Sequence, residues 1–130
     1  MIGIDTNVLV RALVDVVHPH HGPAKELLAG LTEAEPGFVT QITLAELYWV
    51  MAKSLGIDRE SRLRVIRGLI ESPTLEFDDG EGVVRALSLA EEGADFPDAL
   101  IQGAMELFGI DETVTFDKAA SKRLGWRLLA

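Results

Sequence analysis

The sequence predicts an α/β fold built on a mainly parallel sheet, and three observations support this prediction. Short strand-like apolar segments alternate along the chain with longer segments of helical periodicity. The 130 residues are 48% hydrophobic and 25% charged, which is enough apolar material for a substantial core. No internal repeat, low-complexity tract or linker interrupts the pattern, so we expect a single domain over residues 1–130.

The expected elements follow one another with short connections. The segments expected to form strands, with the first of them buried, are 1–4, 37–40, 74–77, 112–116 and 126–130. The segments expected to contain helices are 6–14, 18–31, 42–56, 57–72, 80–92, 97–108 and 118–124. Pro23 and Pro97 are tolerated in the first turns of their helices, whereas Gly56, Gly93 and Gly109 are placed to end helices.

Two of these helices have distinctive faces. The helix over 57–72 is amphipathic, with an apolar face centred on Leu63 and Ile66 and several arginines spread around the rest. Interspersed acids favour a solvated surface over an RNA contact for these arginines. The helix over 42–56 is apolar nearly all round at Tyr48-Trp49-Val50-Met51, which fits either a plain core or an interface with another chain.

Composition restricts the class of protein. The net charge is −9 and the pI is about 4.7, which is unusual for a simple nucleic-acid binder. A metal-dependent nuclease partly escapes this restriction, because bound cations reverse the local field. There is no cysteine, so disulfides and thiolate metal sites are excluded. We expect a cytoplasmic protein without signal peptide or membrane contact, since no apolar run approaches a membrane span.

Four acids are placed at the ends of predicted strands or in the first turns of the helices that follow. They are Asp5, Glu46, Asp98 and Asp117. Each has a purely structural interpretation, because acids near helix N-termini complement the helix dipole and unpaired N–H groups. Thr43-Leu-Ala-Glu46 matches a capping box, and the nearby Asp95 is expected to cap the helix that Pro97 opens.

The joint pattern of the four acids has a second interpretation. In a parallel sheet, the carboxyl ends of the strands meet at one edge, so these side chains can converge there. Two carboxylates about 5 Å apart repel by roughly 3 kcal/mol at an effective dielectric near 20. A cluster of carboxylates therefore favours a neutralising cation, and an all-oxygen set suits Mg²⁺ or Mn²⁺.

Taken together, four stretches resemble the PIN-domain ribonuclease family, and specifically its small VapC-type toxins. These stretches are IDTNVLVRAL at the start, TLAEL around Glu46, DFPDALI at 95–101 and TFD at 115–117. The resemblance covers essentially the whole chain in the same order and spacing. It implies a PIN-like α/β/α sandwich with a central, mainly parallel sheet of about five strands.

The resemblance also implies an active site. Asp5, Glu46, Asp98 and Asp117 would be catalytic residues and ligands for Mg²⁺ or Mn²⁺, with Asp5 and Asp98 binding the metal directly. Glu46 and Asp117 would act through water or hold a second metal. In the family-type mechanism, a metal-activated water attacks a phosphodiester bond of RNA.

Supporting residues are expected beside these acids. The resemblance implies that Asn7 and Thr115 orient them. Arg11 follows Asp5 on the same predicted helix and is a candidate for contacting a phosphate of the RNA. A metal site at His18, His20 and His21 is not favoured, because no fourth ligand is in view.

The resemblance further implies partners. VapC-type toxins form homodimers and are neutralised by a small VapB-type antitoxin, giving a heterotetramer or larger assembly. The net charge of −9 would attract a basic antitoxin segment.

Two other functions are compatible with an α/β fold that carries these acids. A catalytically inactive PIN-like module that only binds a partner is one. An α/β phosphoryl-transfer domain is the other, and it fits poorly, since Asn7 stands where a haloacid-dehalogenase-type domain needs a second Asp.

Overall fold

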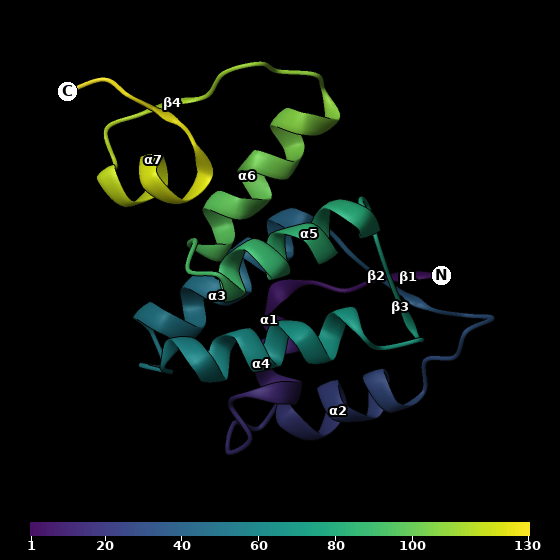
Figure 1. The fold of residues 1–130 in the computed structure, drawn as a ribbon. Helices are drawn as coiled ribbons and strands as arrows, with labels where there is room; N and C mark the ends of the chain where they lie inside the picture. The colour runs from purple at the N-terminus through teal and green to yellow at the C-terminus, as the bar shows by residue number, and fades with distance from the viewer. The chain divides into compact units, whose positions relative to one another are not determined.

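A computed structural model describes all residues from 1 to 130 and divides them into two compact units. Unit 1 comprises Met1–Asp79 and unit 2 comprises Gly80–Ala130. The α/β class predicted from the sequence is confirmed, with the order of elements as expected (Figure 1). The single-domain organisation stays a prediction. No helix has both the length and the apolar character required to cross a bilayer.

Unit 1 is a parallel sheet with four helices. Its strands are β1 (Ile2–Gly3), β2 (Gly37–Val39) and β3 (Leu75–Phe77). Its helices are α1 (Thr6–Leu13), α2 (His21–Ala29), α3 (Gln41–Lys53) and α4 (Arg59–Ile70). The strand order is β1-β2-β3, and Gly37 of the central strand pairs with Ile2 on one side and Leu75 on the other.

The core of unit 1 forms where α3 packs against α1 and against α4. Fully buried side chains come from each of these helices, including Leu9, Leu47, Met51 and Ile66. Gly37 has a steric role in β2, because a Cβ at this position would lie 2.9 Å from Leu75 Cδ2.

Unit 2 is built on two packed helices and a short strand pair. Its elements are α5 (Gly80–Glu91), α6 (Phe96–Leu107), β4 (Val114–Thr115), α7 (Lys118–Leu124) and β5 (Arg127–Leu128). Helices α5 and α6 pack with Gly103 beside Gly82, where a Cβ on Gly103 would be in ordinary van der Waals contact with Gly82 Cα at 3.8 Å. Trp126 is buried and its Nε1 donates to Gln102 Oε1 at 2.6 Å, which ties the segment after α7 to α6.

Several sequence predictions need correction. The five expected strands are present and all pairings are parallel, but they form one sheet of three strands and another of two. The first strand is not buried, because it is only Ile2–Gly3 and Ile2 is 46% exposed; the buried residue is Ile4 beyond it. The strands have two or three residues each, so the longer apolar runs continue into turns and caps.

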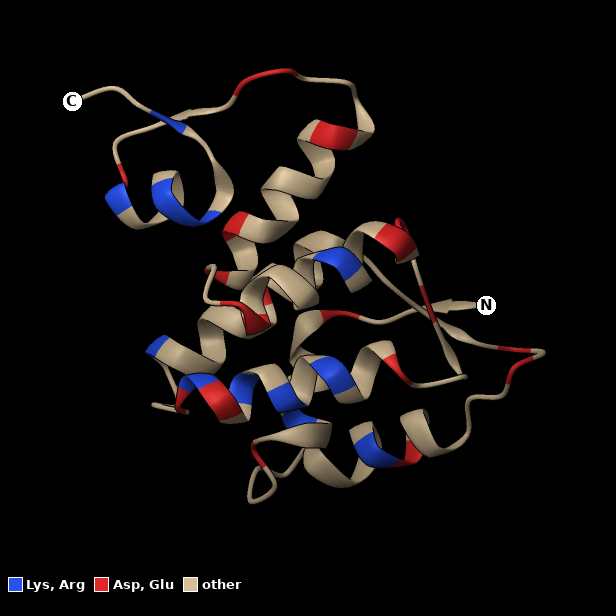
Figure 2. Ribbon diagram, in the orientation of Figure 1, with Lys and Arg blue, Asp and Glu red and all other residues tan.

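The apolar stretch of α3 belongs only in part to the core. Tyr48 and Met51 are buried in the core, whereas Trp49 is 62% exposed, with Lys53 Nζ 5.9 Å from its ring centroid. The solvated surface predicted for the arginines of α4 holds only in part, because Arg62 is half-buried, donates from Nε to the Ile57 carbonyl oxygen at 3.0 Å and lies 4.3 Å from the Tyr48 ring centroid. Figure 2 shows the basic residues of unit 1 concentrated on α4.

Candidate active site

In unit 1, acids gather at the carboxyl end of the parallel sheet. Asp5 follows the first strand and is the N-cap of α1, its Oδ1 accepting from the Thr6 backbone N–H at 2.8 Å. Its carboxylate is exposed. The expected structural role of Asp5 is therefore present, and it leaves the remaining oxygen lone pairs open to a ligand.

Glu46 lies in the second turn of α3 and does not form the predicted capping box. The N-cap of α3 is Thr40, whose Oγ1 accepts from the Thr43 backbone N–H at 3.1 Å. Because the N-cap lies three residues before Thr43, the carboxylate of Glu46 is free for another contact: it accepts a hydrogen bond from Thr6 Oγ1. Thr6 directly follows Asp5, so this hydrogen bond joins the two acidic segments of unit 1.

Asp78 is an acid that the sequence reasoning missed. It follows β3 directly, and its Oδ1 accepts from the Gln41 backbone N–H at 2.9 Å. Since β3 is parallel to the other strands, Asp78 lies at the same edge of the sheet as Asp5. The signal that would have found it is its place immediately after the predicted strand TLEF.

In unit 2, Asp98 and Asp117 interact with one another. Asp98 is half-buried in the first turn of α6, and Asp95 is the N-cap as predicted, accepting from the Asp98 backbone N–H at 3.2 Å. Burial raises the pKa of Asp98 above the ordinary aspartate value, and the nearby carboxylates of Asp95 and Asp117 raise it further. The ionised Asp98 is therefore electrostatically unfavourable in this unit without a compensating cation.

Asp117 is the N-cap of α7, as its structural interpretation predicted. Its Oδ1 accepts from the backbone N–H groups of Ala119 and Ala120 at 2.8 and 3.1 Å. Thr115 Oγ1 accepts from the Asp117 backbone N–H at 3.0 Å and so helps to fix the backbone that carries the acid.

The predicted site residues are thus divided between the units: Asp5 and Glu46 belong to unit 1, and Asp98 and Asp117 to unit 2. Neither unit by itself holds three His, Asp or Glu side chains grouped to bind a metal ion. The donors are nevertheless chemically suited to a hard cation, because they are all carboxylate oxygens.

The basic and histidine residues have definite partners. Arg11 Nη1 pairs with Asp15 Oδ2 at 2.9 Å, and Arg85 is bound by both carboxylate oxygens of Glu106. His18 Nδ1 accepts from the His20 backbone N–H, whereas His21 Nδ1 lies 2.7 Å from the Arg11 carbonyl oxygen. The rings of His18 and His20 lie against one another, with centroids 4.8 Å apart, whereas His21 has a separate partner.

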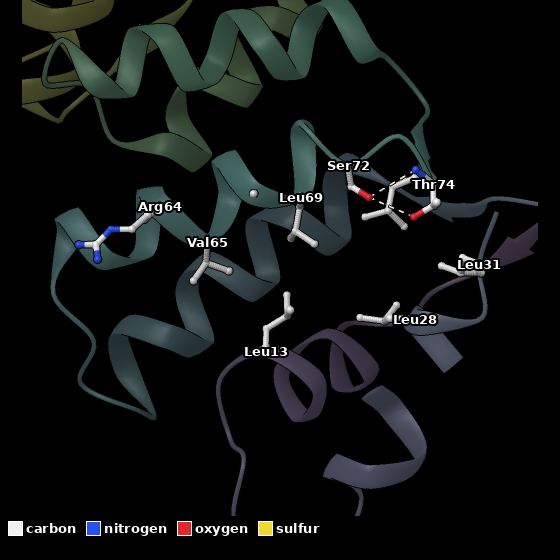
Figure 3. Close-up of a pocket in the computed structure, with 10 residues that line it drawn as sticks. Leu13, Leu28, Leu31, Arg64, Val65, Leu69, Ser72 and Thr74 are labelled. Atoms are coloured by element: carbon white, nitrogen blue, oxygen red, sulfur yellow. Dashed lines mark hydrogen bonds between the residues drawn. The ribbon is translucent and has the colours of Figure 1, made fainter. Parts of the chain in front are cut away.

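A separate cavity in unit 1 has a different character (Figure 3). It has a volume of about 360 Å³ and is surrounded mainly by aliphatic side chains, including Leu13, Leu28, Leu31 and Leu69. Its polar lining consists of Arg64 and the hydroxyls of Ser72 and Thr74, which lie 3.1 Å apart. No carboxylate lines it, so it offers none of the chemistry of the acidic residues.

Comparison with known proteins agrees with the acidic pattern. A family model of the PIN domain matches residues 2–124, a stretch that includes all four predicted acids and most of each unit. No curated protein and no solved structure matches the chain. PIN domains are generally nucleases that typically use divalent metal ions such as Mg²⁺. Because the match extends over nearly the whole sequence, the chain belongs to the PIN-domain family.

Proposed function

We propose that this protein is a metal-dependent endoribonuclease whose site comprises Asp5, Glu46, Asp98 and Asp117. The observation that carries the proposal is the PIN-domain match over residues 2–124, within which every one of these acids is present. Their positions at strand ends and helix starts also fit a site at the carboxyl edge of an α/β fold.

The donor chemistry supports Mg²⁺ or Mn²⁺ as the cofactor. Asp5 and Asp98 would bind the ion directly, with Glu46 and Asp117 completing the site through water or at a second ion. The raised pKa of Asp98 fits this assignment, because a bound cation would offset the repulsion from Asp95 and Asp117. When bound, such an ion lowers the pKa of an attacking water and stabilises charge that develops on a phosphate.

The residues of the chain have their own tasks in this proposal. The hydrogen bond from the Thr6 backbone N–H holds the Asp5 carboxylate in place at the start of α1. Thr6 Oγ1 orients the Glu46 carboxylate, and Thr115 holds the backbone of Asp117. We further propose that Asn7 supports Asp5 and that Arg11 contacts a phosphate of the RNA.

The decisive experiment is cleavage of a panel of structured and single-stranded RNAs. The protein would be assayed with Mg²⁺, with Mn²⁺ and with EDTA, beside an Asp5→Asn variant as the control for contaminating nucleases. We expect cuts that require metal and that disappear in the variant. Metal binding without cuts on any RNA would favour the inactive binding module instead. Cleavage that persists in the variant or in EDTA would contradict the proposed site.

We propose a toxin role on the resemblance to VapC-type proteins. It includes a homodimer and a VapB-type antitoxin, in a heterotetramer or larger assembly. Exposed apolar side chains on α3, Ile42 at 79% and Trp49 at 62%, are consistent with a surface that another chain covers. Induced expression in bacteria should arrest growth for the wild type but not for Asp5→Asn, and light scattering should give the mass of a dimer. Equal growth of the two strains would contradict the toxin role.

A further inference from the structure

A small cavity lies between α1 and α2, beside the acidic end of α1. Its volume is about 290 Å³, near the lower limit of roughly 300 Å³ for small-ligand pockets. Asn7 and Arg11 line it from α1, and His20 lines it from the residue before α2. Val8 and Ala24 contribute apolar surface. The two helices contact one another within unit 1 (Figure 1).

We propose that this cavity binds one base of the RNA next to the bond that is cut. The inference rests on the proposed function, and it adds a place where base identity is read. Asn7 lies two residues after Asp5, and Arg11 follows four residues later on the same helix. At 1.5 Å per residue, the cavity extends about 6 Å along α1 away from Asn7. A nucleotide beside one whose phosphate is at Asp5 can therefore reach it.

The lining has the chemistry that recognises a base. Unstacked RNA bases are read by stacking on aromatic rings, including His, and by hydrogen bonds to their edges. The Asn7 side chain is exposed and makes no hydrogen bond in the structure, so its amide offers both a donor and an acceptor. His20 is also exposed and lines the cavity, and its ring lies against the His18 ring, with the two centroids 4.8 Å apart.

Charge favours a nucleotide over an acidic or basic peptide segment. No Asp or Glu lines the cavity, although the chain as a whole has a net charge of −9. Arg11 is the one charged lining residue, and its pairing with Asp15 through Nη1 leaves other N–H donors of the guanidinium available. This lining suits a nucleotide. The apolar wall and the imidazole can contact the face of a base, the amide can bond to its edge, and the guanidinium can contact a neighbouring phosphate.

The test measures binding of a short RNA that the wild type cuts, taken from the cleavage panel. Binding is followed by fluorescence anisotropy in an Asp5→Asn background, so that the RNA stays intact. His20→Ala removes the stacking ring, and Lys25→Ala is the matched control, an exposed residue of α2 outside the cavity. We expect His20→Ala to weaken binding about tenfold, and the control by about twofold or less.

A second RNA identifies the contact as one to a base. In this RNA, an abasic nucleotide replaces in turn each of the nucleotides beside the cut. At one position, the abasic RNA should bind about tenfold more weakly than the intact RNA to the protein that retains His20. For this abasic RNA, His20→Ala should cause no further loss of affinity. A filling variant, Ala24→Leu, should produce the same loss on the intact RNA. Circular dichroism confirms folding of each variant.

The outcomes separate this inference from the proposed function. Cleavage by Asp5→Asn, or an RNA panel that is neither cut nor bound, would overturn both. Suppose that Asp5→Asn abolishes cleavage but His20→Ala binds RNA as tightly as the Lys25→Ala control does. The proposed base-binding site is then contradicted, whereas the proposed nuclease activity is supported. Equal losses on intact and abasic RNA would also overturn the base site, because His20 would then act on the backbone or the fold. Equal binding of a DNA of the same sequence would assign the cavity to single strands of either kind.

Discussion

The two units hold their acids in different ways. In unit 1, the acidic segments are joined by a hydrogen bond from Thr6 Oγ1 to Glu46, and Asp5 and Asp78 accept backbone N–H groups. In unit 2, the carboxylate of Asp98 accepts no hydrogen bond and has Asp95 and Asp117 as neighbours. The acids of unit 1 are compensated by donors of the chain itself, whereas Asp98 is opposed by its surroundings.

A bound cation should have a larger effect on the acids of unit 2 than on those of unit 1. A carboxylate that already accepts hydrogen bonds gains less from a bound ion than one that faces other carboxylates. We therefore expect a bound metal to stabilise unit 2 more than unit 1.

The largest expected effect is on catalysis, and it should be equal for the two units. Asp5→Asn and Asp98→Asn should each reduce metal-dependent RNA cleavage by at least about 100-fold, because each removes a proposed metal ligand. Initial rates on the same RNA at saturating Mg²⁺ would measure this. Loss of cleavage in Asp5→Asn alone would restrict the site to unit 1.

A steric test distinguishes the packing of the two units. Gly37→Ala should destabilise the protein by about 1–3 kcal/mol, because the added Cβ would lie 2.9 Å from Leu75 Cδ2 and 3.0 Å from Ile4 Cγ1. Gly103→Ala in unit 2 is the matched control, since its Cβ would meet only ordinary contacts at 3.7 Å. It should be neutral or stabilising by up to about 1 kcal/mol. Urea unfolding measures both, and equal effects would contradict the packing described for β2.

The hydrogen bond of unit 1 offers a smaller test. Thr6→Val keeps the shape of the buried side chain but removes the donor to Glu46, and should cost about 1 kcal/mol of unfolding free energy. Glu46→Gln keeps an acceptor oxygen and should cost less. Chemical denaturation of both variants and of the double variant gives the coupling between the residues. A coupling energy of zero would show that this hydrogen bond does not stabilise unit 1.

The smallest expected effect concerns pH. The pKa of Asp98 is raised in the folded state, so the folded protein binds more protons than the unfolded chain between the ordinary value of 3.8 and the raised one. The ionised Asp98 carboxylate therefore lowers the free energy of unfolding at pH values above this range. This loss of stability disappears as the pH falls through the range. Asp98→Asn should raise the melting temperature at pH 7, and the gain over the wild type should disappear below about pH 3.8.

Metal offers the complementary measurement for the same residue. Mg²⁺ or Mn²⁺ should raise the melting temperature of the wild type at pH 7, and Asp98→Asn should remove this response. If instead Asp98→Asn melts below the wild type at pH 7 without metal, the Asp98 carboxylate is not opposed by its neighbours as described.

The fold class, the order of elements and the family follow from local patterns and motifs in the sequence. Alternating strand-like and helical periods predict α/β structure because side-chain patterning is local, and the capping roles of Asp95 and Asp117 follow from their positions before helices. The motifs around Asp5, Glu46, Asp98 and Asp117 led to the PIN-domain resemblance, which the match over residues 2–124 confirms at the level of the family.

Other features were decided only by the tertiary structure. The N-cap of α3 is Thr40 and not Thr43, because Gln41 at the start of the helix is bonded to Asp78, which lies far along the chain. The contact of Glu46 with Thr6, the raised pKa of Asp98 and the cavity at Asn7 and His20 likewise join residues from separate elements. Such features depend on the packing of segments that are distant in the sequence. A periodic pattern along the chain does not indicate how far apart these segments lie in space.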